Sequence, residues 1–287
     1  MKPKAEAGTY AALAVGLAVL VACAGGITQT TPATPVAMAG ATPATPAAGR
    51  PAGFLTAATL PNALATIPPS PKAGDARNTL DWDIFLKTRA LEGSDRWKLA
   101  ISDDSYKPAD VMKDFSCAVG VTLTPENSPA LMSIIGRTTI DAGMAAEAAK
   151  QFYKRTRPFQ NNPGNICIDR DGGIAKSFDY PSGHASLGFT AGLVIAQLAP
   201  DHSTAVLARG RAYGESRVVC GVHNMSAVEA GRTNAAGVFA ALQGSDEYRA
   251  SLDKARAELA AARAAGGVPD AAMCAKEAEL VKPLQVY

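Results

Sequence analysis

The sequence lacks any C-x-x-C pair among its five cysteines, and it has only three histidines, His184, His202 and His223. Structural zinc sites usually depend on such closely spaced ligands, so we expect neither a metal nor another cofactor. Basic runs with interleaved aromatic residues are also missing, and the net charge is only +2. This balance argues against a nucleic-acid-binding surface.

Strand-like alternation of polar and apolar residues is absent as well, and no long internal repeat is present. The 287 residues suit one large domain or two small ones, and 47% hydrophobic with 19% charged residues is ordinary for a globular protein. Beyond the first 70 residues the apolar spacing is mainly helical. The sequence therefore predicts a single compact all-α domain over residues 71–287, with folding beginning between Leu60 and Leu80.

Residues 1–23 resemble an export signal, with an apolar run from Ala11 to Val21 that is too short to predict a membrane span. The end of this segment, Leu20 to Cys23, fits a lipoprotein processing site at which the cysteine is lipidated. We therefore expect a periplasmic or outer-membrane protein that contacts the membrane through a lipid anchor. Ordinary cleavage after Ala24 and an uncleaved anchor are the alternatives.

Residues 24–70 are rich in Ala, Thr and Pro, and TPATP occurs twice, from Thr31 and from Thr42. Such a composition cannot bury a core, so the segment is interpreted as a flexible tether. A structured proline-rich motif that binds a partner is the alternative.

Helical periodicity and end signals predict five longer helices. They run from about Pro125 to Arg157, from Ser182 to Leu198, from Ser203 to Tyr213, from Ser226 to Leu242, and from Ser245 to Gly266. The end signals are Pro158 for the first helix, Pro200 for the second, Gly244 for the fourth and Gly266 for the fifth.

Three short stretches carry residues suited to binding an anion. Lys150 and Arg157 lie seven apart, so on one helix they would share a face about 10 Å apart and could hold an anion, whereas Lys154 and Arg155 would point into solvent. A solvated basic helix end is the alternative.

The second stretch is Pro181-Ser182-Gly183-His184, which opens a predicted helix. Free amides at a helix start bind anions, and Gly183 lets an oxyanion approach the backbone closely. Ser182 can cap the helix and donate to phosphate, while His184 can supply a proton. An ordinary capped helix with an exposed histidine is the alternative.

The third stretch places Arg217 six residues before His223. The planar guanidinium group suits phosphate oxygens, and a neutral imidazole can attack phosphorus. Considered alone, the stretch also fits a loop with a surface arginine.

Together, Lys150-x6-Arg157-Pro158, Pro181-Ser182-Gly183-His184 and Ser216-Arg217-x5-His223 resemble the three-part signature of the phosphatidic acid phosphatase type 2 superfamily, which includes vanadium haloperoxidases. The similarity is closest to its class A bacterial non-specific acid phosphatases and covers roughly Asp95 to Leu242. This resemblance implies a helical fold, small phosphomonoester substrates and possible self-association.

By this resemblance, five residues hold the phosphate oxygens: Lys150, Arg157, Ser182, Gly183 and Arg217. His223 attacks phosphorus, His184 protonates the leaving alcohol, and water hydrolyses the phosphohistidine. Phosphoryl transfer needs mainly positioning and charge neutralisation, which these groups supply without a metal.

One position departs from the family pattern. The family carries an aspartate four residues after the nucleophilic histidine, where this sequence has Ala227. That aspartate holds the other ring nitrogen and fixes the tautomer. Three interpretations of this departure are open. Another group replaces the aspartate, the enzyme is active but slow, or the chain is an inactive phosphate-binding relative. The candidate replacements are Glu229, Asn224, Ser226, Asp141 or a backbone carbonyl, and a large gain in rate from Ala227→Asp would mean that none of them serves.

Four cysteines remain once Cys23 is set aside, an even number suited to an oxidising compartment, and their spacing leaves three pairings open. In the context of the resemblance, we hypothesise Cys167–Cys220, which would join two phosphate-binding loops, and Cys117–Cys274. The competing functions are a surface-tethered inactive binding protein and a vanadium-dependent haloperoxidase. A membrane-lipid phosphatase is disfavoured because no spanning segments flank the motifs.

Overall fold

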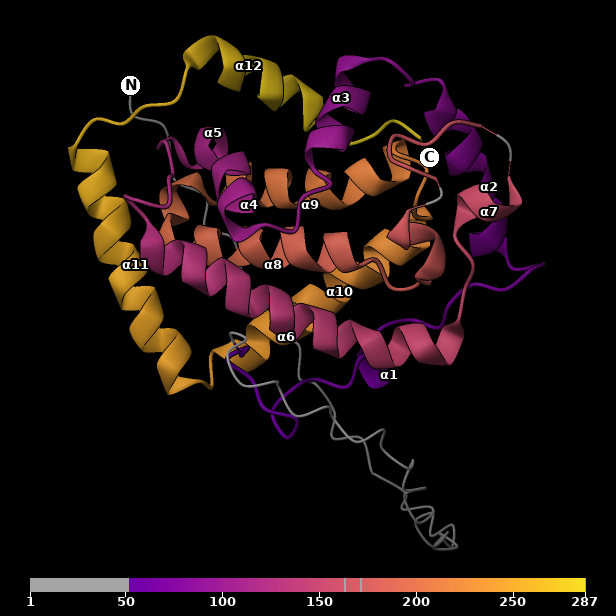
Figure 1. Ribbon diagram of the computed structural model, residues 1–287, viewed down its shortest axis with the longest axis horizontal. Helices are drawn as coiled ribbons and strands as arrows, with labels where there is room; N and C mark the ends of the chain where they lie inside the picture. Colours follow the sequence, from indigo (N-terminus) through magenta and orange to yellow (C-terminus); the bar gives the residue numbers. More distant parts are fainter. Residues whose placement is uncertain (1–51, 163, 171, 287) are drawn as a thin grey trace, which may run out of the picture. The chain divides into compact units, whose positions relative to one another are not determined.

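The computed structural model describes residues 52–162, 164–170 and 172–286, and within these ranges the chain is helical with no strand (Figure 1). The all-α prediction is therefore confirmed. The α-helices are α1 (Ala63–Thr66), α2 (Ala76–Arg89), α3 (Asp95–Ser102), α4 (Pro108–Asp114), α5 (Ser116–Val119), α6 (Pro129–Tyr153), α7 (Pro158–Asn161), α8 (Gly183–Leu198), α9 (Ser203–Val219), α10 (Met225–Leu242), α11 (Asp246–Ala264) and α12 (Ala271–Leu280). Two 3₁₀ turns, η1 (Gly173–Lys176) and η2 (Pro200–His202), complete the elements.

Helix α8 is the centre of the fold and packs against α6, α9 and α10 (Figure 1). It is apolar nearly all round, as expected of a helix enclosed by others. Small residues allow α9 to approach closely: a Cβ atom at Gly188 would lie 2.5 Å from the side chain of Tyr213. The main core gathers around this contact and includes Ile134, Ile135 and Val194, all fully buried.

The folded domain starts earlier than the predicted boundary at residue 71. Phe54 and Leu55 are 8% exposed and belong to the main core. Their backbone amides donate to the carboxylate of Asp141 at 2.9 and 3.1 Å. The predicted tether thus includes a segment that packs on α6, because two large apolar residues follow its Ala/Thr/Pro-rich part. The predicted export signal and the rest of the tether, up to residue 51, lie outside the described residues.

Both hypothesised disulfides are present. Cys117–Cys274 links α5 to α12, and Cys167–Cys220 links the segment after α7 to the C-terminal end of α9. The pairing is therefore confirmed, and it fastens the peripheral α12 to the body.

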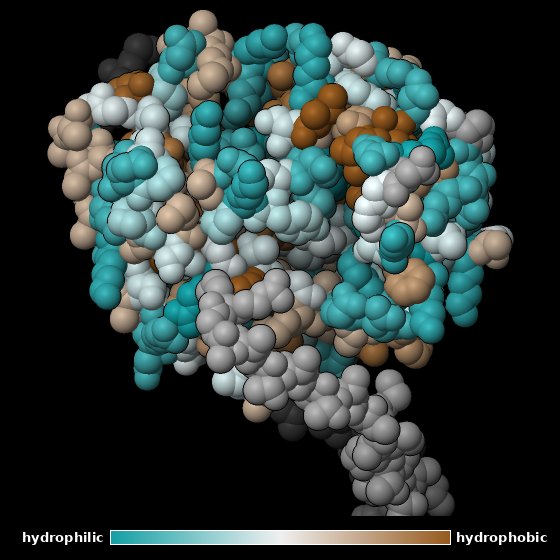
Figure 2. Space-filling view, viewed as in Figure 1, coloured by the Kyte–Doolittle hydropathy of each residue, from teal (hydrophilic) through white to brown (hydrophobic). Residues whose placement is uncertain are grey.

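Among the described residues, no helix is long and apolar enough to cross a membrane. Figure 2 shows hydrophilic residues over much of the face in view, with one brown hydrophobic patch near the place where Figure 1 marks the C-terminus.

Candidate functional site

The first motif does not lie on one helical face as the sequence suggested. Helix α6 ends at Tyr153 because Lys154 adopts a left-handed conformation with φ 46°, and Arg157 instead caps α7. Lys150 and Arg157 nevertheless turn toward the same site. The Lys150 Nζ atom donates to the Phe178 carbonyl at 2.8 Å, and Arg157 Nη1 lies 2.9 Å from His223 Nε2.

The second motif opens α8 as predicted. Ser182 is the N-cap, and its Oγ accepts from the Ala185 amide at 3.3 Å. By helix geometry the amides of Gly183 and His184 have no acceptor within α8, so they are available to an anion. A Cβ atom at Gly183 would lie 2.9 Å from the Tyr106 hydroxyl oxygen, so a side chain there would crowd the pocket.

The third motif begins inside a helix, so the alternative of a loop with a surface arginine is wrong. Helix α9 continues to Val219, and Arg217 is fully buried. Its guanidinium group donates to the carbonyl of Ala100 and forms an ion pair with Asp104, while its Nε atom has no hydrogen-bond partner among the residues that the structure describes. A buried cation with an unused donor is suited to receive an anion.

The chain then reverses between Arg217 and His223. Gly221 has φ +81°, a conformation that side chains disfavour, and a Cβ atom there would lie 2.5 Å from the Arg89 guanidinium. Arg89 donates to the carbonyls of Val218 and Val219 at 3.0 and 2.6 Å, which satisfies the open end of α9. This turn returns His223 to the side of Arg157.

His184 is buried in the pocket beside an aromatic ring. Its Nε2 atom lies 3.1 Å from the Asp104 carbonyl oxygen and 3.5 Å from the Asp104 carboxylate, and its ring centre is 4.0 Å from that of Tyr106. Burial, and next the charge of Arg217, hold the pKa of His184 well below 6.5. The empty site therefore favours neutral imidazole.

His223 is held at both ring nitrogens. Nδ1 lies 2.8 Å from Asp179 Oδ1, and Nε2 lies 2.9 Å from Arg157 Nη1. A carboxylate can only accept, so Nδ1 carries the hydrogen and Nε2 keeps its lone pair. Burial, followed by the charges of Arg157 and Lys150, holds the pKa of His223 well below 6.5. The imidazole is thus neutral, as a nucleophile must be.

Asp179 is the functional residue that the sequence interpretation missed. None of the four proposed side chains is the group that accepts from His223. Asp141 binds the amides of Phe54 and Leu55, Ser226 binds Asp81, Asn224 donates to Asp179, and Glu229 lies 3.8 Å from Arg77. The available signal was an acidic residue two positions before the second motif, whereas the candidates came mainly from the region of the third.

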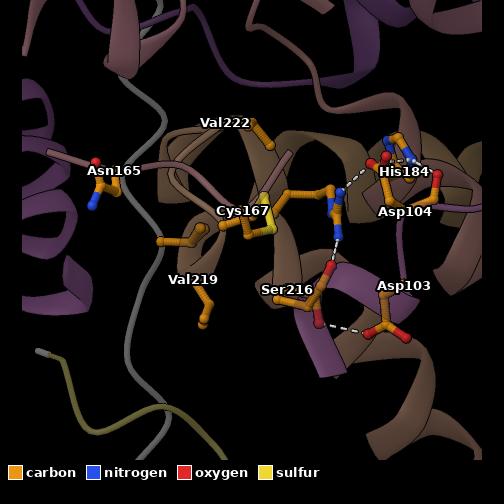
Figure 3. Close-up of a disulfide and its surroundings, with 12 residues drawn as sticks. Asp103, Asp104, Asn165, Cys167, His184, Ser216, Val219 and Val222 are labelled. Atoms are coloured by element: carbon orange, nitrogen blue, oxygen red, sulfur yellow. Dashed lines mark hydrogen bonds and ion pairs between the residues drawn. A yellow bond between two sulfur atoms is a disulfide. The ribbon is translucent and has the colours of Figure 1, made fainter. Parts of the chain in front are cut away.

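A pocket of about 370 Å³ opens beside Arg157 and His184, and two of its lining residues, Asp104 and Arg157, contact Arg217 and His223 of the third motif. Its lining residues are Asp104, Tyr106, Arg157, Ile168, Asp169, Gly172, Gly173, Ile174, Ser177 and His184. Figure 3 shows Asp104 beside His184 and, nearby, the Cys167–Cys220 bridge. His223 and Arg157 both contribute to lowering the pKa of His184, so the two imidazoles share one electrostatic environment. The described residues contain no group of three or more His, Cys, Asp or Glu side chains suited to a metal ion.

Comparison with known proteins yields matches over the same region. The PAP2 superfamily profile matches residues 130–246, which include all three motifs. An acid phosphatase of Zymomonas mobilis is 39% identical over 72% of this chain and 78% of its own length. The chain belongs to the PAP2 superfamily.

Two further relatives agree with this PAP2 assignment. Non-specific acid phosphatases of Providencia stuartii and Salmonella typhimurium are 33% and 35% identical, over 69% and 67% of this chain and 81% and 78% of their own lengths. The predicted similarity to class A non-specific acid phosphatases is confirmed. The PAP2 match spans helices α6 to α10, which carry or flank the site.

Proposed function

We propose that this protein is an acid phosphatase that hydrolyses small phosphomonoesters through a phosphohistidine at His223. The observation that carries the proposal is the state of that imidazole, which is neutral, bound to a carboxylate at Nδ1 and faced by a cation at Nε2. The names of the relatives support the same activity.

The charges around the pocket suit a transferring phosphoryl group. Its transition state spreads negative charge over three oxygens, which need donors in fixed positions. Lys150, Arg157 and Arg217 provide cations, and Ser182 and the first amides of α8 provide further donors. Burial and nearby Arg157 lower the pKa of Lys150 to about 8, so its ammonium group stays charged at acid pH.

In the first step, the Nε2 lone pair of His223 forms a bond to phosphorus while the ester P–O bond breaks. The leaving oxygen takes that electron pair and receives a proton from His184. In the second step, water attacks phosphorus and gives a proton to His184, and the N–P bond electrons return to His223. The cycle restores both imidazoles and needs no metal or redox partner.

An acidic optimum follows from the pKa of His184. In the empty site, burial and Arg217 keep this histidine neutral. A bound phosphate adds negative charge that offsets the nearby cations and favours the protonated imidazole. The phosphate group of a phosphomonoester also carries one proton below its second pKa, which is about 6. We expect a bell-shaped profile on the acid side of neutrality, and a rate that rises steadily through neutrality would contradict these roles.

The pocket also indicates a broad range of leaving groups. Tyr106, Ile168 and Ile174 supply apolar surface to its lining, beside the charged groups. Apolar contact with a pocket wall discriminates weakly between leaving groups. We infer that small aryl, sugar and nucleoside monophosphates are accepted, and that polymeric nucleic acid is not a substrate.

We further propose that the protein is exported to the periplasm or outer membrane, where a lipid on Cys23 would anchor it. Two disulfides among four cysteines support export, because such bonds persist in oxidising compartments. Incorporation of labelled fatty acid that is lost in Cys23→Ser would support lipidation, whereas release of a soluble form cut after Ala24 would contradict it.

The test of activity is hydrolysis of p-nitrophenyl phosphate at about pH 5 to 7 with excess EDTA, comparing His223→Ala with wild type. His202→Ala is the matched control, since its side chain is 40% exposed and does not line the pocket. We expect turnover in wild type and the control and none in His223→Ala. No turnover in wild type would favour an inactive binding protein, and activation by vanadate would favour a haloperoxidase.

A further inference from the structure

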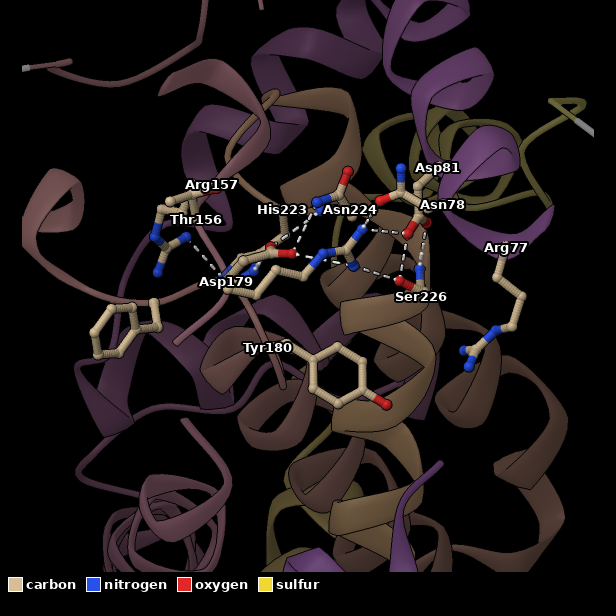
Figure 4. A network of polar contacts seen from close by, with 12 residues as sticks. Arg77, Asn78, Asp81, Thr156, Arg157, Asp179, Tyr180, His223, Asn224 and Ser226 are labelled. Carbon is tan, nitrogen blue, oxygen red and sulfur yellow. Dashed lines mark hydrogen bonds and ion pairs between the residues drawn. The ribbon is translucent and has the colours of Figure 1, made fainter. Parts of the chain in front are cut away.

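Asp179 lies in the segment between η1 and α8, and its side chain is fully buried. Besides the 2.8 Å contact to His223 Nδ1, its Oδ1 atom accepts from the Asn224 amide at 3.2 Å, and Oδ2 accepts from Asn224 Nδ2 at 2.8 Å. Figure 4 shows the carboxylate between these two residues. A carboxylate with this many donors has its oxygens fixed in space.

Arg155 supplies the charge that balances this buried carboxylate. Its Nη1 atom lies 3.5 Å from Asp179 Oδ2, and Nη2 lies 2.9 Å from Asp81 Oδ2. The side chain is 11% exposed, so the expectation that it points into solvent is wrong. Arg155 Nη1 also donates to Ser226 Oγ, and the backbone amide of Ser226 donates to Asp81. The guanidinium group is therefore fixed from both sides.

The segment that carries Asp179 runs beside the helix that carries Ala227. The Ser182 amide donates to the Ala227 carbonyl at 2.9 Å. Ala227 is fully buried in a cluster with Tyr180 and Ala149. A larger side chain at position 227 would have to displace this cluster. The carboxylate that reaches the imidazole in this protein therefore comes from position 179, while the side chain at position 227 contributes only apolar packing.

We propose that Asp179, with Arg155 as its counter-ion, is the positioning pair for the nucleophile and replaces the carboxylate that the family carries at the position of Ala227. The inference rests on the proposed function. Asp179 holds the Nδ1 hydrogen, so that Nε2 presents its lone pair, and it stabilises the charge that the ring gains as the N–P bond forms. Burial raises the pKa of Asp179, and the charge of Arg155 opposes this rise, so the arginine favours the ionised carboxylate.

The first experiment compares Asp179→Asn with Asp83→Asn, an exposed aspartate on α2. We expect kcat of Asp179→Asn to fall about 10²- to 10⁴-fold, by analogy with removal of an orienting aspartate in a serine protease. KM for p-nitrophenyl phosphate and binding of inorganic phosphate should change only about threefold or less, because the cationic groups stay in place. Wild-type kcat in Asp179→Asn would overturn the inference.

The second experiment moves the carboxylate back. We expect kcat of the double variant Asp179→Ser with Ala227→Asp to be at least about tenfold higher than that of Asp179→Ser alone. This gain would restore one order of magnitude of the loss expected above. Ala227→Asp alone should reduce activity, since it adds a second buried carboxylate. A large gain from Ala227→Asp in the wild-type background would overturn the inference, because it would mean that the nucleophile lacked an orienting group.

A third variant tests the counter-ion. Asp179 is faced by Arg155, Arg157, Lys150 and His223, and Arg155→Met removes one cation. The acid limb of the kcat profile should then move to higher pH, and Arg155→Lys should restore it in part. An unmoved acid limb would overturn the role of Arg155. If wild type itself shows no turnover, the proposed function fails, whereas full activity of Asp179→Asn beside an inactive His223→Ala defeats this inference alone.

Discussion

The carboxylate of Asp104 forms an ion pair with the guanidinium group of Arg217 inside the pocket, and it lies 3.5 Å from His184 Nε2. Arg217 is fully buried, whereas the side chain of Asp104 is 37% exposed. A phosphate group must therefore compete with, or lie beside, a carboxylate that already neutralises one of its cations.

Replacing Asp104 by Asn should tighten the binding of phosphate. Loss of one nearby negative charge, worth about 1 kcal/mol when partly solvated, predicts an inhibition constant for inorganic phosphate about fivefold lower near neutral pH. Asp110→Asn, an exposed aspartate that follows closely in the chain, is the control. Weaker phosphate binding in Asp104→Asn would instead mean that Asp104 serves mainly to hold Arg217 in place.

His184→Asn should discriminate between leaving groups. General acid catalysis contributes about 10²- to 10⁴-fold, and its value depends on how poor the leaving group is. We expect kcat/KM for glycerol phosphate to fall by at least about 10²-fold, and kcat/KM for p-nitrophenyl phosphate, whose phenolate leaves readily, to fall much less, because this ratio reports formation of the phosphohistidine rather than its hydrolysis. Equal losses for the two substrates would remove the general-acid role.

Much of the fold and site could be predicted because the sequence carries local signals. Ser182 and Gly183 mark a helix start, and Gly244 and Gly266 follow helix ends, so α8, α10 and α11 lie close to their expected ranges. The clustering of Lys150, Arg157, Arg217 and both histidines could be predicted because the three motifs together resemble the family signature.

The parts that sequence reasoning missed depend on contacts between distant segments. Asp179 and His223 are 44 residues apart, and Phe54 and Asp141 are 87 apart. Nothing local to Arg155 indicates that Asp81 and Asp179 enclose it. The end of α6 also depends on the left-handed Lys154, which no glycine marked.

The pH dependence of stability offers a separate check on His184. The folded-state pKa of this histidine lies well below 6.5, the value in an unfolded chain, because of burial and Arg217. Below about pH 6.5 the unfolded state binds a proton that the folded state refuses, so stability falls as the pH falls. Between pH 6.5 and the folded-state pKa, the free energy of unfolding of wild type should lose up to about 1.4 kcal/mol per pH unit more than that of His184→Asn.

Urea titrations at several pH values give these slopes, and the difference between the two proteins cancels the contributions of other buried acids. Added phosphate should flatten the wild-type slope, since it favours protonated His184. Parallel slopes for the two proteins would show that His184 titrates normally.

The two disulfides should differ in their effect on activity. Cys167–Cys220 links the segment that contributes Ile168 to the pocket lining with the turn between Arg217 and His223. Cys117–Cys274, in contrast, joins elements that do not line the pocket. Their sequence separations of 53 and 157 predict stabilisation of about 4 and about 5 kcal/mol by loop entropy. Removing either pair by Cys→Ser should lower the melting temperature, but only the loss of Cys167–Cys220 should also lower kcat/KM. Unchanged kcat/KM without Cys167–Cys220 would mean that the bridge does not shape the site.

The most direct measurement identifies the residue that carries phosphate during turnover. His184→Asn is mixed with p-nitrophenyl phosphate, whose leaving group needs little protonation, so that the hydrolysis step lacks its base and the intermediate accumulates. The reaction is quenched in alkali, because phosphohistidine is labile in acid, and the peptides are analysed by mass spectrometry. The account predicts phosphate on the peptide containing His223 and none after His223→Ala, and phosphate on any other residue would contradict it.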